Sequence, residues 1–286
     1  MVLTQALVSG ILLGTFYAVI ATGFSLIFGV TRVFNLAHGE FVVIGGYIGY
    51  WLWKIYGINP FMSIPVSMIL LILLGTFFQR ILAYTREPYE LNTLVLTFGL
   101  SIFLQNLMLA LWSGNYRLIV IDSLEKSISL GIINTSLGRV FIFIFSIFSI
   151  LFLHYFMKKT YFGKAMRATS QDRESAAITG INVKRMDLLA FSIGAAMTGA
   201  AGPLFASIHY LYPSVGIKAT IIALIVTIFA GVGNIVGILA GGIILGVGES
   251  LTVAIMGSQW RELASSAILI ALLLIRPYGL FEGRRY

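Results

Sequence analysis

Long apolar runs separated by short polar breaks dominate the chain. Most of these runs are long enough, at 1.5 Å of helical rise per residue, to cross the roughly 30 Å of hydrocarbon in a bilayer. They lie at residues 5–29, 35–57, 61–80, 91–112, 138–157, 187–210, 218–232, 235–253 and 259–275. The pattern predicts an all-α, polytopic transmembrane bundle of about eight to ten spans. It disfavours a β-barrel, whose strands alternate apolar and polar residues.

One of the runs, at 218–232, is short for a span. It meets the next run at Gly231-Val232-Gly233-Asn234, a cluster of residues that favours turns. The sequence therefore predicts either a helical hairpin or one discontinuous helix near 218–253.

The composition agrees with a lipid environment. Of the 286 residues, 58% are apolar and 10% are charged, whereas a soluble domain has roughly 25% charged residues. Water cannot accommodate that much apolar surface, and disordered chains are poor in apolar residues, so a soluble enzyme and a disordered chain are both excluded. The absence of cysteine excludes disulfides, iron–sulfur clusters and thiolate–zinc sites.

Lysine and arginine are divided unevenly between alternate loops. With nine spans and the N-terminus outside, thirteen of the nineteen lie on the cytoplasmic side and six on the outer side. The positive-inside rule then predicts an outer N-terminus and a cytoplasmic C-terminus in the plasma or inner membrane. The net charge of +8 is mostly a signal of this topology, and we expect no nucleic-acid partner, because no basic stretch is interleaved with aromatic residues.

Two loops stand out within what we expect to be a single transmembrane domain over residues 1–286. The outer loop at 113–137 alternates apolar and polar residues enough to predict a short β-ribbon. The loop at 158–186 is the longest polar stretch, and the charge distribution assigns it to the cytoplasmic side.

Small residues spaced four apart recur in the apolar runs. This spacing places them on one helix face, where they allow two backbones to approach closely. Any one pair is typical of ordinary membrane packing, but together they indicate a compact bundle suited to lining a narrow path. The pairs are Gly10/Gly14, Gly45/Gly49, Ala195/Gly199, Gly237/Gly241 and Gly242/Gly246.

Few polar residues lie inside the runs. Asn35 and His38 are three residues apart and would share a helical face, while Glu40 would point elsewhere unless the helix is broken between them. Glu40 is near the start of its run and can lie at the membrane interface, which avoids much of the energetic cost of a buried charge. Gln105 and Asn106 form the deepest polar pair. For both groups two interpretations stay open, the lining of a translocation path and ordinary structural hydrogen bonding.

The polar loop at 158–186 contains the signals of a short helix. Asp172 can cap its start and Gly180 suits the left-handed position after its end, which predicts about two turns at 173–179. Glu174 suits the positive end of the helix dipole, and two alanines give the helix a small-residue face. Such a helix can dock into a groove of another protein, or it can lie on the lipid headgroups as a linker. The candidate contacts with a partner are Asp172, Glu174, Ala176, Ala177 and Gly180.

The sequence offers no arrangement of catalytic or metal-binding residues. The three histidines lie in separate segments, and no metalloprotease or nucleophile-elbow motif is present. No GxxxxGK[ST] motif is present, so we expect this chain not to bind nucleotide through a P-loop. The alternatives to a subunit driven by a partner are an ion-coupled carrier, an intramembrane enzyme using His38 and Glu40 as acid–base groups, and a purely structural membrane subunit.

Three regions carry motifs in chain order. They are GFSLIFGVTRVFNLAHGEFVVIGGY (23–47), GKAMRATSQDRESAAITGINVKRM (163–186) running on into FSIGAAMTGAAG (191–202), and IRPYGLFEGRR (275–285). Together they resemble the permease subunits of branched-chain amino-acid ABC importers, in particular the shorter of the two permeases that such systems pair. Within the second region, Glu174-Ser175-Ala176-Ala177 followed by Gly180 resembles the importer motif glutamate-alanine-alanine…glycine, with Ser175 in place of an alanine.

The resemblance implies an assembly. It would contain a second permease subunit, two cytoplasmic ATPases that bind ATP and an extracytoplasmic substrate-binding protein, with no cofactor on this chain. The loop at 158–186 would transmit closure of the ATPases to the spans, and a branched-chain or related amino acid would cross the bilayer by alternating access. Permeases for urea and short amides share these motifs and remain an alternative.

Overall fold

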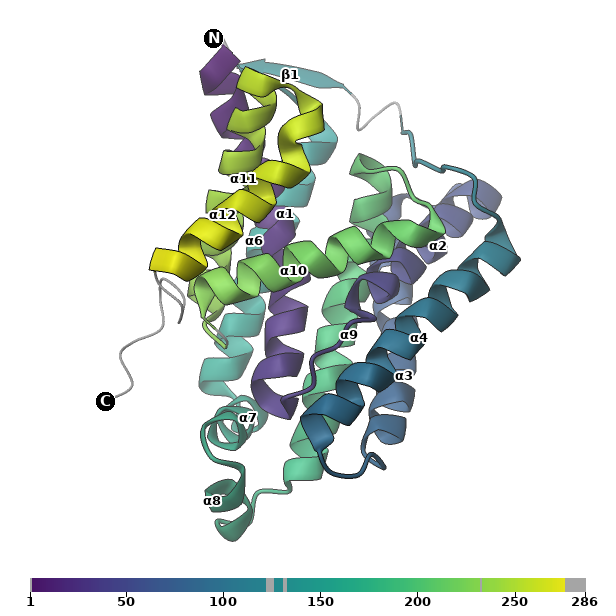
Figure 1. Ribbon diagram of the computed structural model, residues 1–286. Coiled ribbons are helices and arrows are strands. Elements are labelled where there is room, and N and C mark those ends of the chain that lie inside the picture. The colour runs from purple at the N-terminus through teal and green to yellow at the C-terminus, as the bar shows by residue number, and fades with distance from the viewer. Residues whose placement is uncertain (1, 122–125, 131–132, 232, 276–286) are drawn as a thin grey trace. The chain divides into compact units, whose positions relative to one another are not determined.

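The computed structural model describes residues 2–121, 126–130, 133–231 and 233–275, which are largely helical (Figure 1). Short 3-10 turns at Pro213–Val215 and Ser258–Trp260 precede α10 and α12. The helices are α1 (Val2–Thr31), α2 (His38–Tyr56), α3 (Pro60–Leu82), α4 (Tyr89–Trp112), α6 (Leu137–Lys159), α7 (Tyr161–Gln171), α8 (Arg173–Ile178), α9 (Val183–Ile208), α10 (Gly216–Ala230), α11 (Ile235–Met256) and α12 (Arg261–Ile275).

The helices confirm the prediction of a polytopic bundle. Each predicted apolar run corresponds to one helix. Within the described residues, seven segments are long and apolar enough to cross a membrane. These are α1, α3, α4, α6, α9, α11, and α10 together with the turn before it. The helices α2, with 19 residues, and α12, with 15, account for the other two predicted runs.

The short run at 218–232 forms a helix of its own. Helix α10 ends at Ala230 and α11 begins at Ile235, so the structure shows two separate helices rather than one interrupted helix. Gly231 and Gly233 both adopt positive φ angles, of 80° and 83°, which suit glycine far better than other residues. Asn234 then caps α11 by accepting a hydrogen bond from the Gly237 N–H at 3.0 Å.

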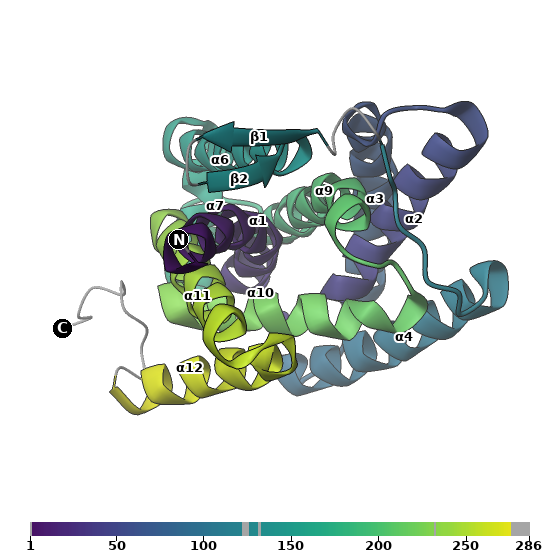
Figure 2. The same cartoon turned by 90° about the horizontal axis from the view of Figure 1, so that it is seen from above.

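The predicted ribbon in the loop at 113–137 is also present. Strands β1 (Ser127–Leu130) and β2 (Ile133–Ser136) pair antiparallel, with Ser127 opposite Ser136 (Figure 2).

The chain forms two compact units. Unit 1 comprises Met1–Thr22, Val120–Leu151 and Ile222–Tyr286, and unit 2 comprises Gly23–Ile119 and Phe152–Ile221. Helices α1, α6 and α10 each contribute residues to both units.

In unit 1, α1 and α11 cross through two of the predicted glycine pairs. A Cβ added to Gly14 would collide with the Gly242 carbonyl oxygen, and one added to Gly246 would collide with the Gly10 carbonyl oxygen. The two backbones are therefore in direct contact, as expected for helices that associate through GxxxG faces.

In unit 2, α9 packs against both α2 and α3 by the same means (Figures 1 and 2). A Cβ on Gly202 would collide with the backbone of Gly45, and one on Gly199 would lie 2.8 Å from the Ser67 carbonyl oxygen of α3. Small residues on α9 thus bring three helices close together and position the segment that joins α1 to α2.

Candidate functional site

The chain is not helical between α1 and α2. Thr31 ends α1, with its hydroxyl accepting a hydrogen bond from the Val33 N–H at 3.1 Å, and Arg32 adopts a positive φ of 57°. Asn35 lies in the turn before α2, where its side-chain oxygen accepts a hydrogen bond from the Ala37 N–H at 3.1 Å. The prediction that Asn35 and His38 share a helical face is therefore wrong: Asn35 lies before the helix, where short polar side chains compete with helical hydrogen bonding.

Two threonines from distant helices fix this break in place. Thr97 of α4 donates to the Phe34 carbonyl at 2.9 Å and accepts from the Leu36 N–H at 3.3 Å. Thr220 of α10 accepts a hydrogen bond from the Gly39 N–H at 2.8 Å. The irregular backbone thus finds partners inside the protein, which is the condition for non-helical backbone at membrane depth.

The break buries three of the predicted site residues together. Asn35, His38 and Glu40 are each 0% exposed. His38 packs edge-on against the ring of Phe24 of α1, with 5.4 Å between the ring centroids. The two carboxylate oxygens of Glu40 and the amide nitrogen of Asn35 are buried without a hydrogen-bond partner among the described residues. Glu40 is therefore enclosed by the protein.

Helix α4 presents a stripe of polar side chains to the interior of unit 2. Its residues recur every four positions, so each lies about one turn from the next. Tyr89 and Gln105, at the two ends of the stripe, are half-buried, and the residues between them are buried. The stripe consists of Tyr89, Thr93, Thr97, Ser101 and Gln105.

The predicted pair on α4 is split between two environments. Gln105 belongs to the polar stripe, whereas Asn106 is exposed and its side chain donates to the Ile102 carbonyl of the same helix at 2.8 Å. Adjacent helical residues point about 100° apart, which explains the difference.

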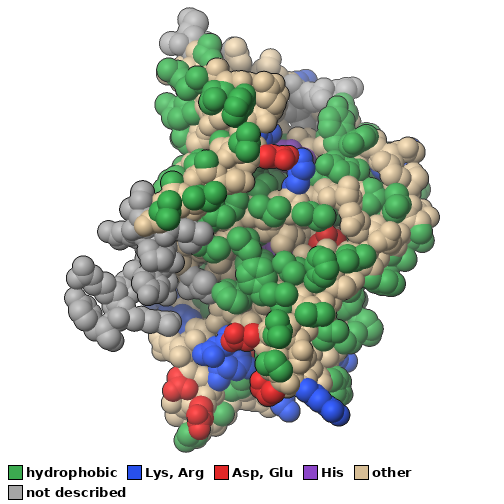
Figure 3. Space-filling view, in the orientation of Figure 1, with side chains coloured by type: hydrophobic (Ala, Val, Ile, Leu, Met, Phe, Trp, Pro, Cys, Tyr) green, Lys and Arg blue, Asp and Glu red, His purple; other side chains and the backbone are tan. Residues whose placement is uncertain are grey.

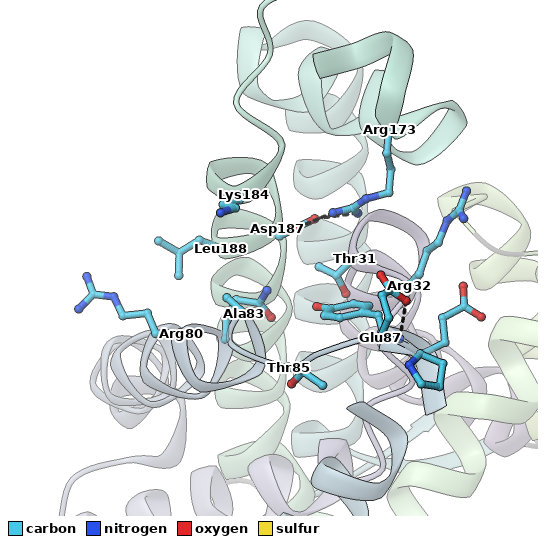
Figure 4. A pocket seen from close by; sticks show the side chains of 14 residues that line it. Thr31, Arg32, Arg80, Ala83, Thr85, Glu87, Arg173, Lys184, Asp187 and Leu188 are labelled. Carbon is cyan, nitrogen blue, oxygen red and sulfur yellow. Dashed lines mark hydrogen bonds and ion pairs between the residues drawn. The ribbon is translucent and has the colours of Figure 1, made fainter. Parts of the chain in front are cut away.

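A cavity of about 710 Å³ lies where α1, α3, α8 and α9 meet near the start of α4 (Figure 4). Tyr89 lines it, so the polar stripe of α4 begins at this cavity. Gln79 of α3 also lines it, is 3% exposed, and has a buried side-chain oxygen without a hydrogen-bond partner among the described residues. The wall carries charges of both signs, with Arg32, Arg80 and Lys184 beside Glu87 and Glu90.

Arg173 ties α8 to two of the helices around this cavity. Its guanidinium makes a bidentate ion pair with Asp187 of α9, at 3.0 and 2.6 Å, and donates to the Val30 carbonyl of α1 at 2.8 Å (Figure 4). One side chain of α8 therefore contacts both α1 and α9 directly.

The short helix α8 is present at the predicted place and with the predicted caps. Asp172 accepts hydrogen bonds from the Glu174 and Ser175 N–H groups at 3.0 and 3.1 Å, and Gly180 follows the helix with a φ of 87°. The Ser175 hydroxyl, followed by these N–H groups, holds the pKa of Asp172 below its usual value.

The small-residue face of α8 differs from the prediction. Ala176 is buried, at 4% exposure, whereas Ala177 is exposed. The two therefore do not form one exposed face, because they point about 100° apart on the helix. The exposed surface of α8 carries Glu174, Ala177 and Ile178, the last of them 81% exposed.

Charged side chains gather where α7, α8 and the first turn of α9 lie, whereas apolar side chains cover much of the visible face (Figure 3). No cluster of three or more His, Asp or Glu side chains suited to a metal ion occurs in the part of the chain that the structure describes. Apart from Ile275, the predicted motif at 275–285 lies outside the described residues.

Three polar residues of this region were not predicted from the sequence. Thr97 and Ser101 could have been found from the four-residue spacing along α4, which puts hydroxyl groups on one face. The role of Arg173 could not have been found from the sequence. Arg173 is in α8 and its partner Asp187 is in α9, so their pairing depends on how the turn between the two helices folds.

The bundle, its buried polar break and its capped surface helix define a multi-pass membrane transport component. A family model described as "Branched-chain amino acid transport system / permease component" matches residues 6–275. The chain belongs to this family of ABC transporter permeases.

Individual relatives agree with the family. The chain is 32% identical to the high-affinity branched-chain amino acid transport system permease protein LivH of Salmonella typhimurium, over 96% of this chain and 94% of that protein. It is 31% identical to LivH of Escherichia coli K12 and 29% identical to BraD of Pseudomonas aeruginosa, each with the same coverage. No solved structure matches the chain significantly.

The family assignment decides between the functional alternatives. The chain is the permease component of a branched-chain amino-acid ABC transport system, a non-catalytic transport subunit, which argues against the ion-coupled carrier and the intramembrane enzyme. Membership implies partners of three classes: ATPase, binding protein and permease.

Proposed function

We propose that this chain pairs with a second permease subunit to form the path of an importer, and that α8 receives the motion of two cytoplasmic ATPases. The observation that carries the proposal is the construction of α8: a helix of six residues with an aspartate cap, an exposed outer face, and an arginine bound to both α1 and α9. A helix that served only as a linker on the lipid headgroups would not require Arg173 to bind both α1 and α9.

The substrate is proposed from the relatives. The proteins LivH and BraD are named for high-affinity transport of branched-chain amino acids, and the chain matches nearly their whole length. We therefore expect leucine, isoleucine, valine or a related amino acid to be delivered by an extracytoplasmic binding protein and to cross by alternating access.

The path through unit 2 begins at the buried break. Asn35, His38 and Glu40 form a fully buried polar group on it, and the α4 stripe, including Gln105, continues it toward the cavity beside α8. Asn106, on the exposed face of α4, suits the interface with the second permease subunit instead. Since α1, α6 and α10 run through both units, we expect residues 1–286 to act as a single transmembrane domain.

The proposed orientation places α8 in the cytoplasm and the β-ribbon outside, with the N-terminus outside and the C-terminus inside. The chain has no cysteine, so single cysteines can be introduced without removing others. In intact cells, a membrane-impermeant maleimide should label Ser127→Cys at once and Glu174→Cys only after permeabilisation. The reverse pattern would contradict the orientation.

Docking of α8 is tested at its exposed alanine. Ala177→Arg adds bulk and charge at the proposed contact, and it should abolish both ATP-driven uptake and co-purification of the ATPases. Ala177→Ser, matched in position but small, should retain both. Normal uptake by Ala177→Arg would refute the docking role of α8.

A further inference from the structure

Glu40 is a carboxylate that the folded chain leaves without hydrogen bonds. It is 0% exposed, and neither of its oxygens has a hydrogen-bond partner among the described residues. The Ser101 hydroxyl of α4 lies close enough to interact with the carboxylate, although neither carboxylate oxygen forms a well-aligned hydrogen bond. A buried carboxylate in this condition is strongly disfavoured, so its presence calls for a physical reason.

The surroundings of Glu40 compensate its charge only in part. Its Oε1 lies 3.0 Å from the position that a Cβ on Gly216 would occupy, at the start of α10, where the helix dipole is positive. No ion pair to Glu40 is formed within the described residues. A positively charged group is therefore the complement that this position lacks.

Asn35, five positions earlier in the chain, offers a hydrogen-bond donor. Its Oδ1 accepts the hydrogen bond from the Ala37 N–H, while its Nδ2 is buried without an acceptor among the described residues. An unused acceptor of negative charge and an unused neutral donor thus lie within five positions of each other. This combination matches a zwitterion, whose ammonium group donates and whose carboxylate accepts.

We propose that Glu40 binds the ammonium group of the transported amino acid and that Asn35 Nδ2 donates to its carboxylate. The inference rests on the proposed function, because it assumes that the amino acid passes through unit 2. It adds a recognition site on the permease itself, which would select for the part of the substrate that all amino acids share. Selection of the side chain would then fall to other parts of the assembly.

The site is closed on the α10 side. A Cβ on Gly39 would collide with the Gly216 carbonyl oxygen, so the backbones of α2 and α10 touch directly above Glu40. Thr220 strengthens this contact through its hydrogen bond with the Gly39 N–H. Separation of α10 from α2 would open the site, and the stripe from Ser101 to Tyr89 would lead the substrate to the cavity beside α8.

The test uses the whole transporter in proteoliposomes, with its binding protein outside and ATP inside, and leucine as the probe. Glu40→Gln keeps the shape of the side chain and removes its charge. We expect leucine uptake to fall about ten- to hundredfold, the range for loss of a charge-assisted hydrogen bond, while assembly and basal ATP hydrolysis persist. Glu249→Gln is the matched control, since Glu249 is buried but hydrogen-bonded by Tyr17 and Ser265, and it should retain uptake.

A second measurement needs no variant. In detergent, without the binding protein, leucine should raise the thermal stability of the wild-type complex, whereas isocaproate, the same skeleton without the amino group, should not. Glu40→Gln should abolish this difference. Equal stabilisation by the two compounds, or none by leucine, would overturn the inference.

The outcomes separate the inference from the proposed function. Wild-type rates of uptake by Glu40→Gln would overturn the inference alone. A wild-type complex that takes up neither leucine, isoleucine nor valine would overturn the proposed function and the inference with it.

Discussion

Two buried glutamates, one in each compact unit, have the same side chain and nearly the same burial but opposite surroundings. Glu249 of α11 is 2% exposed and accepts hydrogen bonds from the hydroxyls of Tyr17, at 2.8 Å, and Ser265. Glu40 of α2 is 0% exposed, and neither oxygen has a partner among the described residues. Through these hydrogen bonds Glu249 links α1, α11 and α12. A buried carboxylate without such bonds lowers the stability of the fold, and residues of this kind are expected mainly at functional sites.

The contrast does not arise from looser packing around Glu40. Both units bring helices together through glycines whose backbones touch, Gly14 against Gly242 in unit 1 and Gly39 against Gly216 in unit 2. The difference lies in the polar groups alone. Single substitutions can therefore test how Glu40 and Glu249 differ. Some of them disturb the backbone contacts, and others remove one hydrogen bond.

The largest effect is expected where the backbones touch beside Glu40. Gly39→Ala places a Cβ against the Gly216 carbonyl oxygen, where no side chain can move away. We expect a loss of about 3 kcal/mol or more, in the upper range for overpacking, and little folded complex in size-exclusion chromatography. Gly99→Ala, on an exposed face of α4 with nothing within 4 Å, should leave the yield unchanged. A folded Gly39→Ala complex would show that the contact above Glu40 is looser than the one in unit 1.

The next effect concerns the hydrogen bonds that distinguish the two glutamates. Tyr17→Phe removes one donor from Glu249 and should destabilise the complex by about 1–3 kcal/mol, measured as a lower Tm, without changing uptake per folded complex. Ser101→Ala removes a hydroxyl that interacts with Glu40 without a well-aligned hydrogen bond, and it should shift the Tm much less. Equal shifts in the two variants would remove the distinction between the two sites.

Much of the fold follows from the sequence because lipid simplifies the problem. Apolar runs of span length locate the helices, Gly-Val-Gly-Asn at 231–234 separates α10 from α11, and Asp172 with Gly180 delimits α8. In each case the signal is local, since span length, turn residues and caps depend on neighbours within a few positions.

The site was predicted less completely, for reasons that are not local. The cluster at 35–40 was found, but its backbone was predicted to be helical, because nothing nearby shows that Thr97 and Thr220, from distant helices, satisfy a break there. Ala176 and Asn106 were correctly located on helices, yet which way each faces depends on neighbours in space. Sequence identifies the polar residues in a membrane protein more readily than it identifies their partners.

A third buried carboxylate, Asp187, can be changed from a paired state, like that of Glu249, to an unpaired state, like that of Glu40. Asp187 has a side-chain exposure of 9% and is paired with Arg173, so Arg173→Gln would convert it into an unsatisfied carboxylate like Glu40. We expect a loss of about 1–2 kcal/mol, below the range for fully buried pairs because Arg173 is partly exposed. Arg173→Gln/Asp187→Asn should recover part of this loss, and a double-mutant cycle on Tm measures the coupling. Additive effects would show that the pair contributes no coupling between α8 and α9.

The smallest effect is expected at Asp172, a carboxylate satisfied like Glu249 but exposed. Its pKa is lowered by the Ser175 hydroxyl and by the N–H groups of Ser175 and Glu174, so the cap stabilises α8 above the unfolded-state pKa and is lost as the pH falls through the lowered folded-state pKa. The protection factor of the Ser175 amide, which compares its exchange rate with the intrinsic rate at the same pH, should therefore be constant across neutral pH and should fall only in acid. Asp172→Asn, which retains an oxygen acceptor, should remain protected without the acid-dependent fall, whereas Asp172→Ala should have a lower protection factor across neutral pH. Protection in Asp172→Ala equal to wild type would show that contacts of Arg173, rather than the cap, hold the start of α8.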